Sequence, residues 1–340
     1  MRPGPRPSPA EGLTLAEQVG QTVILRFNGT RVPASARRAL RQGRAAGVIL
    51  FTDNVASRGQ LRRLTRTLQA AAGGGALVAT DQEGGPVRRL PFAGPDPAPA
   101  LQATPADAEA AARDAGRELH AIGVNTTLAP VADVPVSPEA VIRPRAFPGS
   151  PTEVGAHVRA AIDAYHGQRV AATAKHFPGL GAARQNTDEA PARIDRSRSQ
   201  MRRSELEPFR AAISEDAPLI MAAHASYPAY DGDRIASQSR PILTGLLRER
   251  LGYRGVVITD SLEAEASLAA SGGSVSTAAL RSIRAGADLA LTTGSASHGV
   301  VFSRLISRAR RSPKLRAKIE RSADRVLALK RELGLPPPGP

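Results

Sequence analysis

The clearest indication of the fold is the segment Ala76-Leu77-Val78-Ala79-Thr80, which is followed at once by Asp81-Gln82-Glu83-Gly84-Gly85. Its first half is a short, continuous apolar run. Such a run is typical of a strand in a parallel sheet whose two faces are both covered. Its second half places acidic residues and glycines directly where that strand ends. The same sequence of an apolar run and a polar loop recurs along the chain.

Eight apolar runs are predicted as strands, with longer helical segments between them. The predicted strands are Thr22–Leu25, Gly47–Phe51, Ala76–Thr80, Thr126–Ala129, Ala172–His176, Leu219–Ala223, Val256–Thr259 and Ala287–Thr292. The predicted helices are Gln60–Ala72, Ala106–Ile122, Pro151 to about Tyr165, Leu206–Ser214 and Leu315–Leu333. Ser150 and Glu153 form a capping-box pattern at the start of the third helix, and Gly123 follows the second.

Eight strand–helix units predict an α/β protein with a (β/α)8 barrel of the TIM type, folded as a single domain. A doubly wound open sheet is the alternative. That fold would place a glycine-rich dinucleotide loop after the first strand, and Phe27-Asn28-Gly29-Thr30 is not such a loop. We expect residues 13–334 to form the barrel, residues 1–12 a disordered proline-rich tail, and residues 335–340 a second loose end.

The composition excludes several classes of protein. The 340 residues include no cysteine, so the chain has no disulfide, cysteine-ligated zinc, iron–sulfur cluster or thiol nucleophile. The six histidines show no paired ligand spacing, and we predict neither a metal nor a cofactor. No apolar run approaches the ~20 residues of a membrane span. Because the N-terminus lacks the apolar segment of a signal peptide, we expect a cytoplasmic protein, exported only if the true start lies upstream of Met1.

The net charge of +15 raises the question of nucleic-acid binding. Arginine supplies 42 of the 46 basic residues and is distributed along the chain, which favours solvated helix faces. Aromatic residues make up only 3%, which leaves little surface for base stacking. We therefore expect a small saccharide rather than nucleic acid as partner, and the sequence predicts no oligomeric state.

Polar residues follow four of the predicted strands, where a barrel builds its active site. Asp81 ends the third strand, Asp133 follows the fourth, Lys175-His176 ends the fifth, and Asp260 ends the seventh. Asp133 by itself is interpreted as the cap of a helix start, a common role for aspartate. Acid, base and glycine at four strand ends together indicate a site.

These residues resemble glycoside hydrolase family 3, in particular its single-domain bacterial β-N-acetylglucosaminidases (β-N-acetylhexosaminidases). The resemblance extends from about Leu13 to Leu333. It is carried by Gly47-Val48-Ile49-Leu50-Phe51, Asp81-Gln82-Glu83-Gly84-Gly85-Pro86-Val87-Arg88-Arg89, Ala129-Pro130-Val131-Ala132-Asp133-Val134, Lys175-His176-Phe177-Pro178-Gly179 and Val256-Val257-Ile258-Thr259-Asp260-Ser261-Leu262. The family fold is a (β/α)8 barrel, in agreement with the strand count.

The resemblance implies a role for each matching residue. Asp260 matches the nucleophile that forms a covalent glycosyl-enzyme, and a carboxylate suits that role because it can attack the anomeric carbon and then leave. The residues that match contacts to the hydroxyls of the terminal sugar are Asp81, Arg89, Arg145, Lys175 and His176. An acid that accepts hydrogen bonds and cations that donate them suit a ligand made of hydroxyl and amide groups.

The chain departs from this branch at the general acid/base. Relatives carry an Asp-Ser-His triplet on the loop after Lys-His-Phe-Pro-Gly, and the corresponding positions here are Asn186, Thr187 and Asp188. In one interpretation Asp188 is the acid/base, because two carboxylates about 5–5.5 Å apart are the usual retaining arrangement. Glu189 is a possible replacement for it, and Arg184 nearby opposes protonation.

Two other interpretations stay open. In the second interpretation, Asn186-Thr187-Asp188 is a degenerate turn, and the protein only binds sugar or hydrolyses it slowly. In the third, the leaving group of the substrate is good enough to need little protonation. The sequence thus predicts a retaining exo-β-glycosidase, most readily a β-N-acetylhexosaminidase acting on terminal β-linked N-acetylglucosamine of peptidoglycan- or chitin-derived saccharides. A sugar-binding homologue, or a β-glucosidase or β-xylosidase of the same family, is the alternative.

Overall fold

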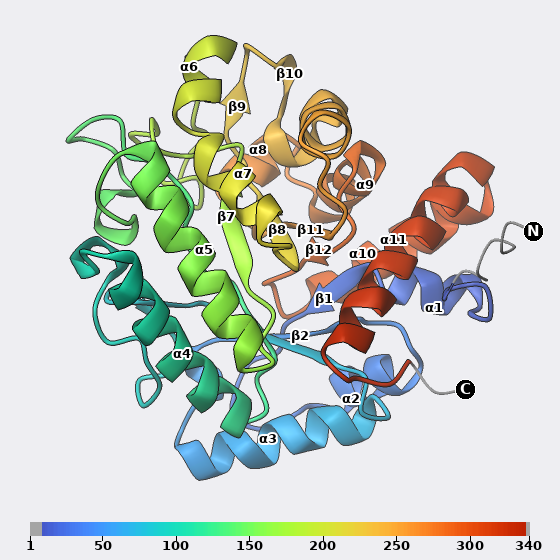
Figure 1. Ribbon diagram of the computed structural model, residues 1–340. Helices are drawn as coiled ribbons and strands as arrows, with labels where there is room; N and C mark the ends of the chain where they lie inside the picture. Colours follow the sequence, from blue (N-terminus) through green and yellow to red (C-terminus); the bar gives the residue numbers. More distant parts are fainter. Residues whose placement is uncertain (1–8, 338–340) are drawn as a thin grey trace, which may run out of the picture.

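The computed structural model describes residues 9–337 and contains a parallel strand in each of the eight predicted segments. One sheet has the order β12-β1-β2-β3-β6 and a second has the order β11-β8-β7. Isolated parallel bridges pair Thr126 with Ala171, Val131 with Lys175, and Ile258 with Leu289. These bridges join the outer strands of one sheet to those of the other, and the strands curl around a common interior (Figure 1).

The strands are short. Their bounds are β1 Val23–Leu25, β2 Gly47–Leu50, β3 Leu77–Thr80, β6 Thr126–Thr127, β7 Thr173–Phe177, β8 Leu219–Ala222, β11 Val256–Thr259 and β12 Ala290–Leu291. In β2, Val48 and Leu50 pack in the layer between sheet and helices, whereas Ile49 packs inside the curled sheet. Because alternate side chains enter two different apolar layers, the strand is apolar at every position.

Helices surround the sheets, and the five predicted helices all form. The helices are α1 Leu15–Gly20, α2 Ala34–Arg41, α3 Arg58–Ala71, α4 Pro105–Ala121, α5 Pro151–Gly167, α6 Arg198–Arg203, α7 Glu207–Ser214, α8 Glu265–Ala269, α9 Val275–Ala285, α10 Ser297–Arg310 and α11 Pro313–Glu332. A π-helix, η5, spans Pro241–Arg250, and short 3-10 turns lie at Thr52–Asn54, Pro99–Leu101, Arg143–Arg145 and Ala236–Gln238. The capping box of Ser150 and Glu153 begins α5, and Gly123 (φ +81°) follows α4.

Two hairpins interrupt the strand–helix order and were not predicted. β4 (Gln82–Gly84) pairs with β5 (Val87–Arg88), and β9 (Ser226–Tyr227) pairs with β10 (Asp231–Ile235). The turn between β4 and β5 uses Gly84 and Gly85, both with positive φ. This hairpin follows β3 directly, so it carries Glu83 and the neighbouring Arg89 to the end of the sheet.

The described chain ends are more ordered than predicted. Residues 9–12 form a turn in which the Ala10 amide donates to Asp324 Oδ1 at 2.9 Å, and Ala10 packs against Ala323 and Leu327 of α11. At the other end, the Leu335 amide donates to the carbonyl of Lys330 at 2.8 Å. Ala10 is fully buried against α11. The prolines around Ala10 made the segment look disordered in the sequence and gave no sign of this contact. The other parts of the predicted tails, residues 1–8 and 338–340, lie outside the described residues.

Candidate active site

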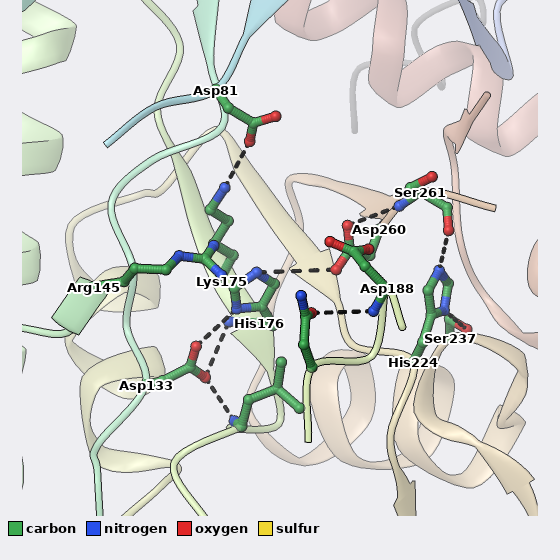
Figure 2. Close-up of polar contacts among 12 residues, drawn as sticks. Asp81, Asp133, Arg145, Lys175, His176, Asp188, His224, Ser237, Asp260 and Ser261 are labelled. Carbon is green, nitrogen blue, oxygen red and sulfur yellow. Dashed lines mark hydrogen bonds and ion pairs between the residues drawn. The ribbon is translucent and has the colours of Figure 1, made fainter. Parts of the chain in front are cut away.

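A cleft of about 610 Å³ opens at the carboxyl ends of the strands. All seven residues predicted for the site contribute to its lining, although they come from distant parts of the chain. They are Asp81, Arg89, Arg145, Lys175, His176, Asp188 and Asp260. Figure 2 shows six of them pointing toward one another, Asp81 and Asp260 from just after β3 and β11, Lys175 and His176 from β7, and Arg145 and Asp188 from loops.

Ion pairs form one side of this cleft. The buried Lys175 ammonium donates to Asp81 Oδ1 at 2.8 Å and lies 2.7 Å from Glu83 Oε1. Arg145 donates to both oxygens of Glu83, at 2.7 and 2.8 Å. Burial alone would raise the pKa of Glu83, but Lys175 and Arg145 outweigh it and bring that pKa to about 2. Glu83 thus stays ionised and fixes both cations, a role that the sequence analysis missed.

His176 is held by a second buried carboxylate. Asp133 Oδ2 lies 2.7 Å from His176 Nδ1, and Asp133 Oδ1 accepts hydrogen bonds from the amides of His176 and Leu180. Since the carboxylate accepts from Nδ1–H, the other ring nitrogen, Nε2, faces Asp260 Oδ2 at 3.9 Å. The interpretation of Asp133 as a helix cap is therefore wrong: the residue orients an imidazole of the cleft.

Asp260 ends β11 and reaches the cleft with 19% of its side chain exposed. The amide of Ser261 donates to its Oδ1 at 2.7 Å. Burial raises the pKa of Asp260, but His176 and His224 outweigh that effect, so the net pKa lies below its ordinary value. A carboxylate that is ionised and partly open to a cleft can act as a nucleophile.

Asp188 lies on the loop after β7 and presents an exposed carboxyl to the same cleft. Desolvation of the Asp188 carboxyl inside the cleft and the charge of Asp260 raise the pKa of Asp188 above its ordinary value. The two carboxyls therefore shift in opposite directions, which is the pattern of an acid/base and nucleophile pair. Glu189, the replacement considered above, instead accepts a hydrogen bond from Asn186 Nδ2 at 3.2 Å.

The Asp188 loop is attached to the start of α8. The carbonyl of Thr187 accepts from the amide of Ala266, and the carbonyl of Asp188 accepts from the amide of Glu265, each at 3.1 Å. The amide of Asp188 donates to Asn186 Oδ1 at 3.1 Å, which closes a local turn. The first amides of a helix lack partners within the helix, so this loop satisfies them and is positioned by them.

A buried histidine supports the segment that carries Asp260. His224 Nε2 donates to the carbonyl of Ser261 at 2.7 Å, and His224 Nδ1 lies 2.7 Å from Ser237 Oγ (Figure 2). This residue was not predicted. Its only sequence signal is its position just after the sixth predicted strand.

The opposite rim combines cations, a ring and a carboxylate. The guanidinium groups of Arg26 and Arg89 lie 4.7 and 5.4 Å from the centre of the Phe51 ring. Glu263 Oε2 accepts hydrogen bonds from the amide and hydroxyl of Thr293 at 2.8 and 3.0 Å. Of these five rim residues, only Arg89 was predicted.

Within residues 9–337, no group of three or more His, Cys, Asp or Glu residues has an arrangement that could hold a metal ion. In that same range, no helix has the length and apolar character needed to cross a membrane.

Comparison with known proteins places the chain in a family. Residues 14–329 match the model of the glycosyl hydrolase family 3 N terminal domain. An uncharacterized secreted glycosyl hydrolase of Arthroderma benhamiae is 34% identical over 341 residues, covering 96% of both chains. A beta-hexosaminidase of Xanthomonas oryzae pv. oryzae is 36% identical, covering 74% of this chain and 77% of the relative.

A solved structure shows the same fold. The glycoside hydrolase family 3 beta-N-acetylglucosaminidase from Paenibacillus sp. superposes with a TM-score of 0.88 at 33% identity, over 95% of this chain. This chain spans 63% of the length of that protein. The chain is thus a member of glycosyl hydrolase family 3, a family of glycoside hydrolases.

These findings confirm the predicted family, and they confirm an α/β fold with a curled parallel sheet. The prediction of a cytoplasmic protein is wrong by this comparison, because the Arthroderma relative, which matches nearly the whole chain, is described as secreted.

Proposed function

We propose that this chain is a retaining exo-β-N-acetylhexosaminidase that removes terminal β-linked N-acetylglucosamine from peptidoglycan- or chitin-derived saccharides. The observation that carries the proposal is the pair of carboxyls in one cleft, Asp260 with a lowered pKa and Asp188 with a raised pKa. The choice of sugar rests on the beta-hexosaminidase of Xanthomonas oryzae and the beta-N-acetylglucosaminidase of Paenibacillus.

In the proposed reaction, Asp260 attacks the anomeric carbon while Asp188 gives its proton to the glycosidic oxygen, and the aglycone leaves as an alcohol. The product of this step is a glycosyl ester of Asp260. Asp188, now ionised, takes a proton from a water molecule that attacks the same carbon, and Asp260 leaves as a carboxylate. Two inversions give net retention.

The remaining polar side chains would hold the terminal sugar. Asp81 accepts hydrogen bonds from hydroxyls, Arg89, Arg145 and Lys175 donate to them, and His176 Nε2 accepts from a hydroxyl when Nδ1–H donates to Asp133. Because Glu83 and Asp133 fix Arg145, Lys175 and His176 before substrate arrives, these groups need little reorganisation in the transition state.

We also propose that the two sheets form one closed (β/α)8 barrel, folded as a single domain over residues 13–334. Parallel bridges between the outer strands of the two sheets support closure.

The test is hydrolysis of p-nitrophenyl β-N-acetylglucosaminide, β-glucoside and β-xyloside by wild type and three alanine variants, Asp260→Ala, Asp188→Ala and Glu189→Ala. We expect Asp260→Ala to be inactive. Asp188→Ala should lose roughly 10²–10⁴-fold in rate, the usual contribution of a general acid. A dinitrophenyl leaving group or added azide should restore much of that loss, and Glu189→Ala should retain its activity.

The competing function is a sugar-binding homologue with a degenerate loop. It is favoured by the turn of Asn186, since Asx turns are common structural uses of this residue. Absence of turnover by wild type on every glycoside, together with thermal stabilisation by free sugar, would establish binding without catalysis. The glycoside turned over fastest identifies the sugar.

A further inference from the structure

The net positive charge of this protein arises in two segments of the sequence, because basic and acidic residues balance elsewhere. Residues 31–76 contain nine arginines and a single acidic residue, Asp53. Residues 296–319 contain seven basic residues and no acidic residue. The rest of the chain contains 30 basic and 30 acidic residues, so the whole net charge of +15 resides in these two segments.

The two segments meet in the folded protein. Helices α2 and α3 of the first segment pack against each other and lie side by side in Figure 1. Just beyond α2, the carbonyl of Arg44 accepts a hydrogen bond from His298 Nε2 of α10 at 2.7 Å. The Arg44 guanidinium also lies 5.7 Å from the centre of the Phe302 ring of α10. The two basic segments, which are far apart in the sequence, thus touch at Arg44 and α10.

Arginines cover the outer faces of α2 and α3. We call this surface the basic wall; it comprises the exposed side chains of Arg37, Arg38, Arg41, Arg62, Arg63 and Arg66. No ion pair within residues 9–337 includes any of these six. Arg37 and Arg41, like Arg62 and Arg66, are four residues apart on one helix, a spacing at which like charges destabilise the helix. Stability therefore does not account for this surface.

The basic wall lies beside one rim of the cleft. Helix α2 follows β1 and α3 follows β2, and the residues just after these two strands, Arg26 and Phe51, line the cleft. Arg89 lies over the Phe51 ring on the same rim. The rim residues Arg26 and Phe51 and the basic wall thus belong to the same two strand–helix units, and between them Arg26 pairs with Asp53 at 3.1 Å.

We propose that the basic wall binds an acidic polysaccharide and holds the polymer while its end enters the cleft. The choice of a polysaccharide rests on the proposed function. Bound counterions are released when a polyanion replaces them, which favours binding at low ionic strength. Arginine also donates paired hydrogen bonds to carboxylate or phosphate groups, the groups that make a glycan acidic.

The side chains of this surface disfavour two other polyanions. The aromatic residues of the two segments are Phe51, which lines the cleft, and Phe302, which is buried, so the basic wall lacks a platform for base stacking. The exposed large hydrophobic residues within residues 9–337 are Leu101, Val136, Val141 and Val300, none on α2 or α3. Apolar side chains that insert beside the cations strengthen binding to a membrane surface, and the described part of α2 and α3 exposes no large one.

The test measures binding of polygalacturonate, a polymer of carboxylated sugars, with neutral dextran as the reference. Wild type should bind only the acidic polymer, and binding should weaken steeply between about 50 and 200 mM salt. The combined variant Arg38→Gln, Arg62→Gln and Arg66→Gln should bind at least about tenfold more weakly. A matched control, Arg202→Gln, Arg203→Gln and Arg234→Gln, removes three exposed arginines elsewhere and should stay within about twofold of wild type.

Three results would overturn the proposal. One is an equal loss in both triple variants, because the binding would then reflect net charge alone. Another is tighter binding of duplex DNA or of vesicles with anionic lipids than of polygalacturonate. The third is no binding at the lower salt concentration. Hydrolysis of the small glycosides should be unchanged in both triple variants. If wild type does not cleave those glycosides but binds the polymer through the basic wall, the proposed glycosidase activity is refuted and the proposed polysaccharide-binding surface is supported.

Discussion

Asp188 and Asp260 carry the same functional group but differ in what surrounds them. Asp260 faces two histidines and accepts a hydrogen bond from the Ser261 amide, and these contacts favour its ionised form. At Asp188, desolvation and the negative charge of Asp260 outweigh the effect of the same two histidines and favour the protonated form. The environment at each residue therefore divides the roles of nucleophile and acid.

The coupling between these carboxyls gives a prediction that does not depend on turnover. Replacing Asp260 by Asn removes the charge that raises the pKa of Asp188, so that pKa should fall toward its ordinary value. Carbon-13 NMR of labelled aspartate carboxyls, titrated in wild type and in Asp260→Asn, measures the change. Asp195→Asn, at an exposed site, is the control. An unchanged Asp188 titration would mean that the two carboxyls do not interact.

At the scale of elements, helix α8 positions the loop that carries Asp188 through two backbone hydrogen bonds. Glu265 is the first residue of α8, and the residue before it, Ala264, has an extended conformation (φ −56°, ψ 139°). Proline is well tolerated at such a position, since its fixed φ suits the helix start and it restricts the preceding residue to extended angles.

We therefore predict that Glu265→Pro leaves α8 intact but releases the Asp188 loop, because proline has no amide hydrogen to donate to the Asp188 carbonyl. The turnover number should fall about tenfold, a small part of what positioning contributes to catalysis. Hydrogen exchange of residues 186–190 should become faster. Glu265→Ala removes the same side chain and keeps the amide, so it should behave as wild type. Equal loss in both variants would assign the effect to the Glu265 side chain.

Elements buried on both faces were predictable from the sequence. β2 and the first three residues of β11 are apolar because their alternate residues enter different layers of the core. The hairpins β4–β5 and β9–β10 do not lie between two apolar layers, so their sequences show no apolar run that would predict strands. The roles of Glu83 and Asp133 were missed for a different reason. Their partners Arg145 and His176 lie 62 and 43 residues away, and only the fold shows which cation or ring each carboxylate meets.

At the scale of the whole molecule, α1 and α11 bring the two described ends of the chain together. A buried polar contact lies between them: Lys330 Nζ of α11 donates to Oε1 of Gln21, the residue just after α1, at 2.7 Å. Both side chains are almost fully buried. Burial lowers the pKa of Lys330 to about 7, because a charged ammonium loses its hydration there.

The lowered pKa of Lys330 predicts how the free energy of unfolding depends on pH. Between about pH 7 and the ordinary lysine pKa near 10.4, the unfolded chain binds a proton that the folded chain does not, so folding becomes more favourable as pH rises. Relative to Lys330→Met, wild type should thus gain up to about 1.4 kcal/mol per pH unit from pH 7 to 9. Urea unfolding of both proteins measures the difference. The exposed Lys314 of the same helix is the control: Lys314→Met keeps Lys330, so its pH dependence should parallel that of wild type. A parallel pH dependence of wild type and Lys330→Met would mean that Lys330 is charged in the folded protein.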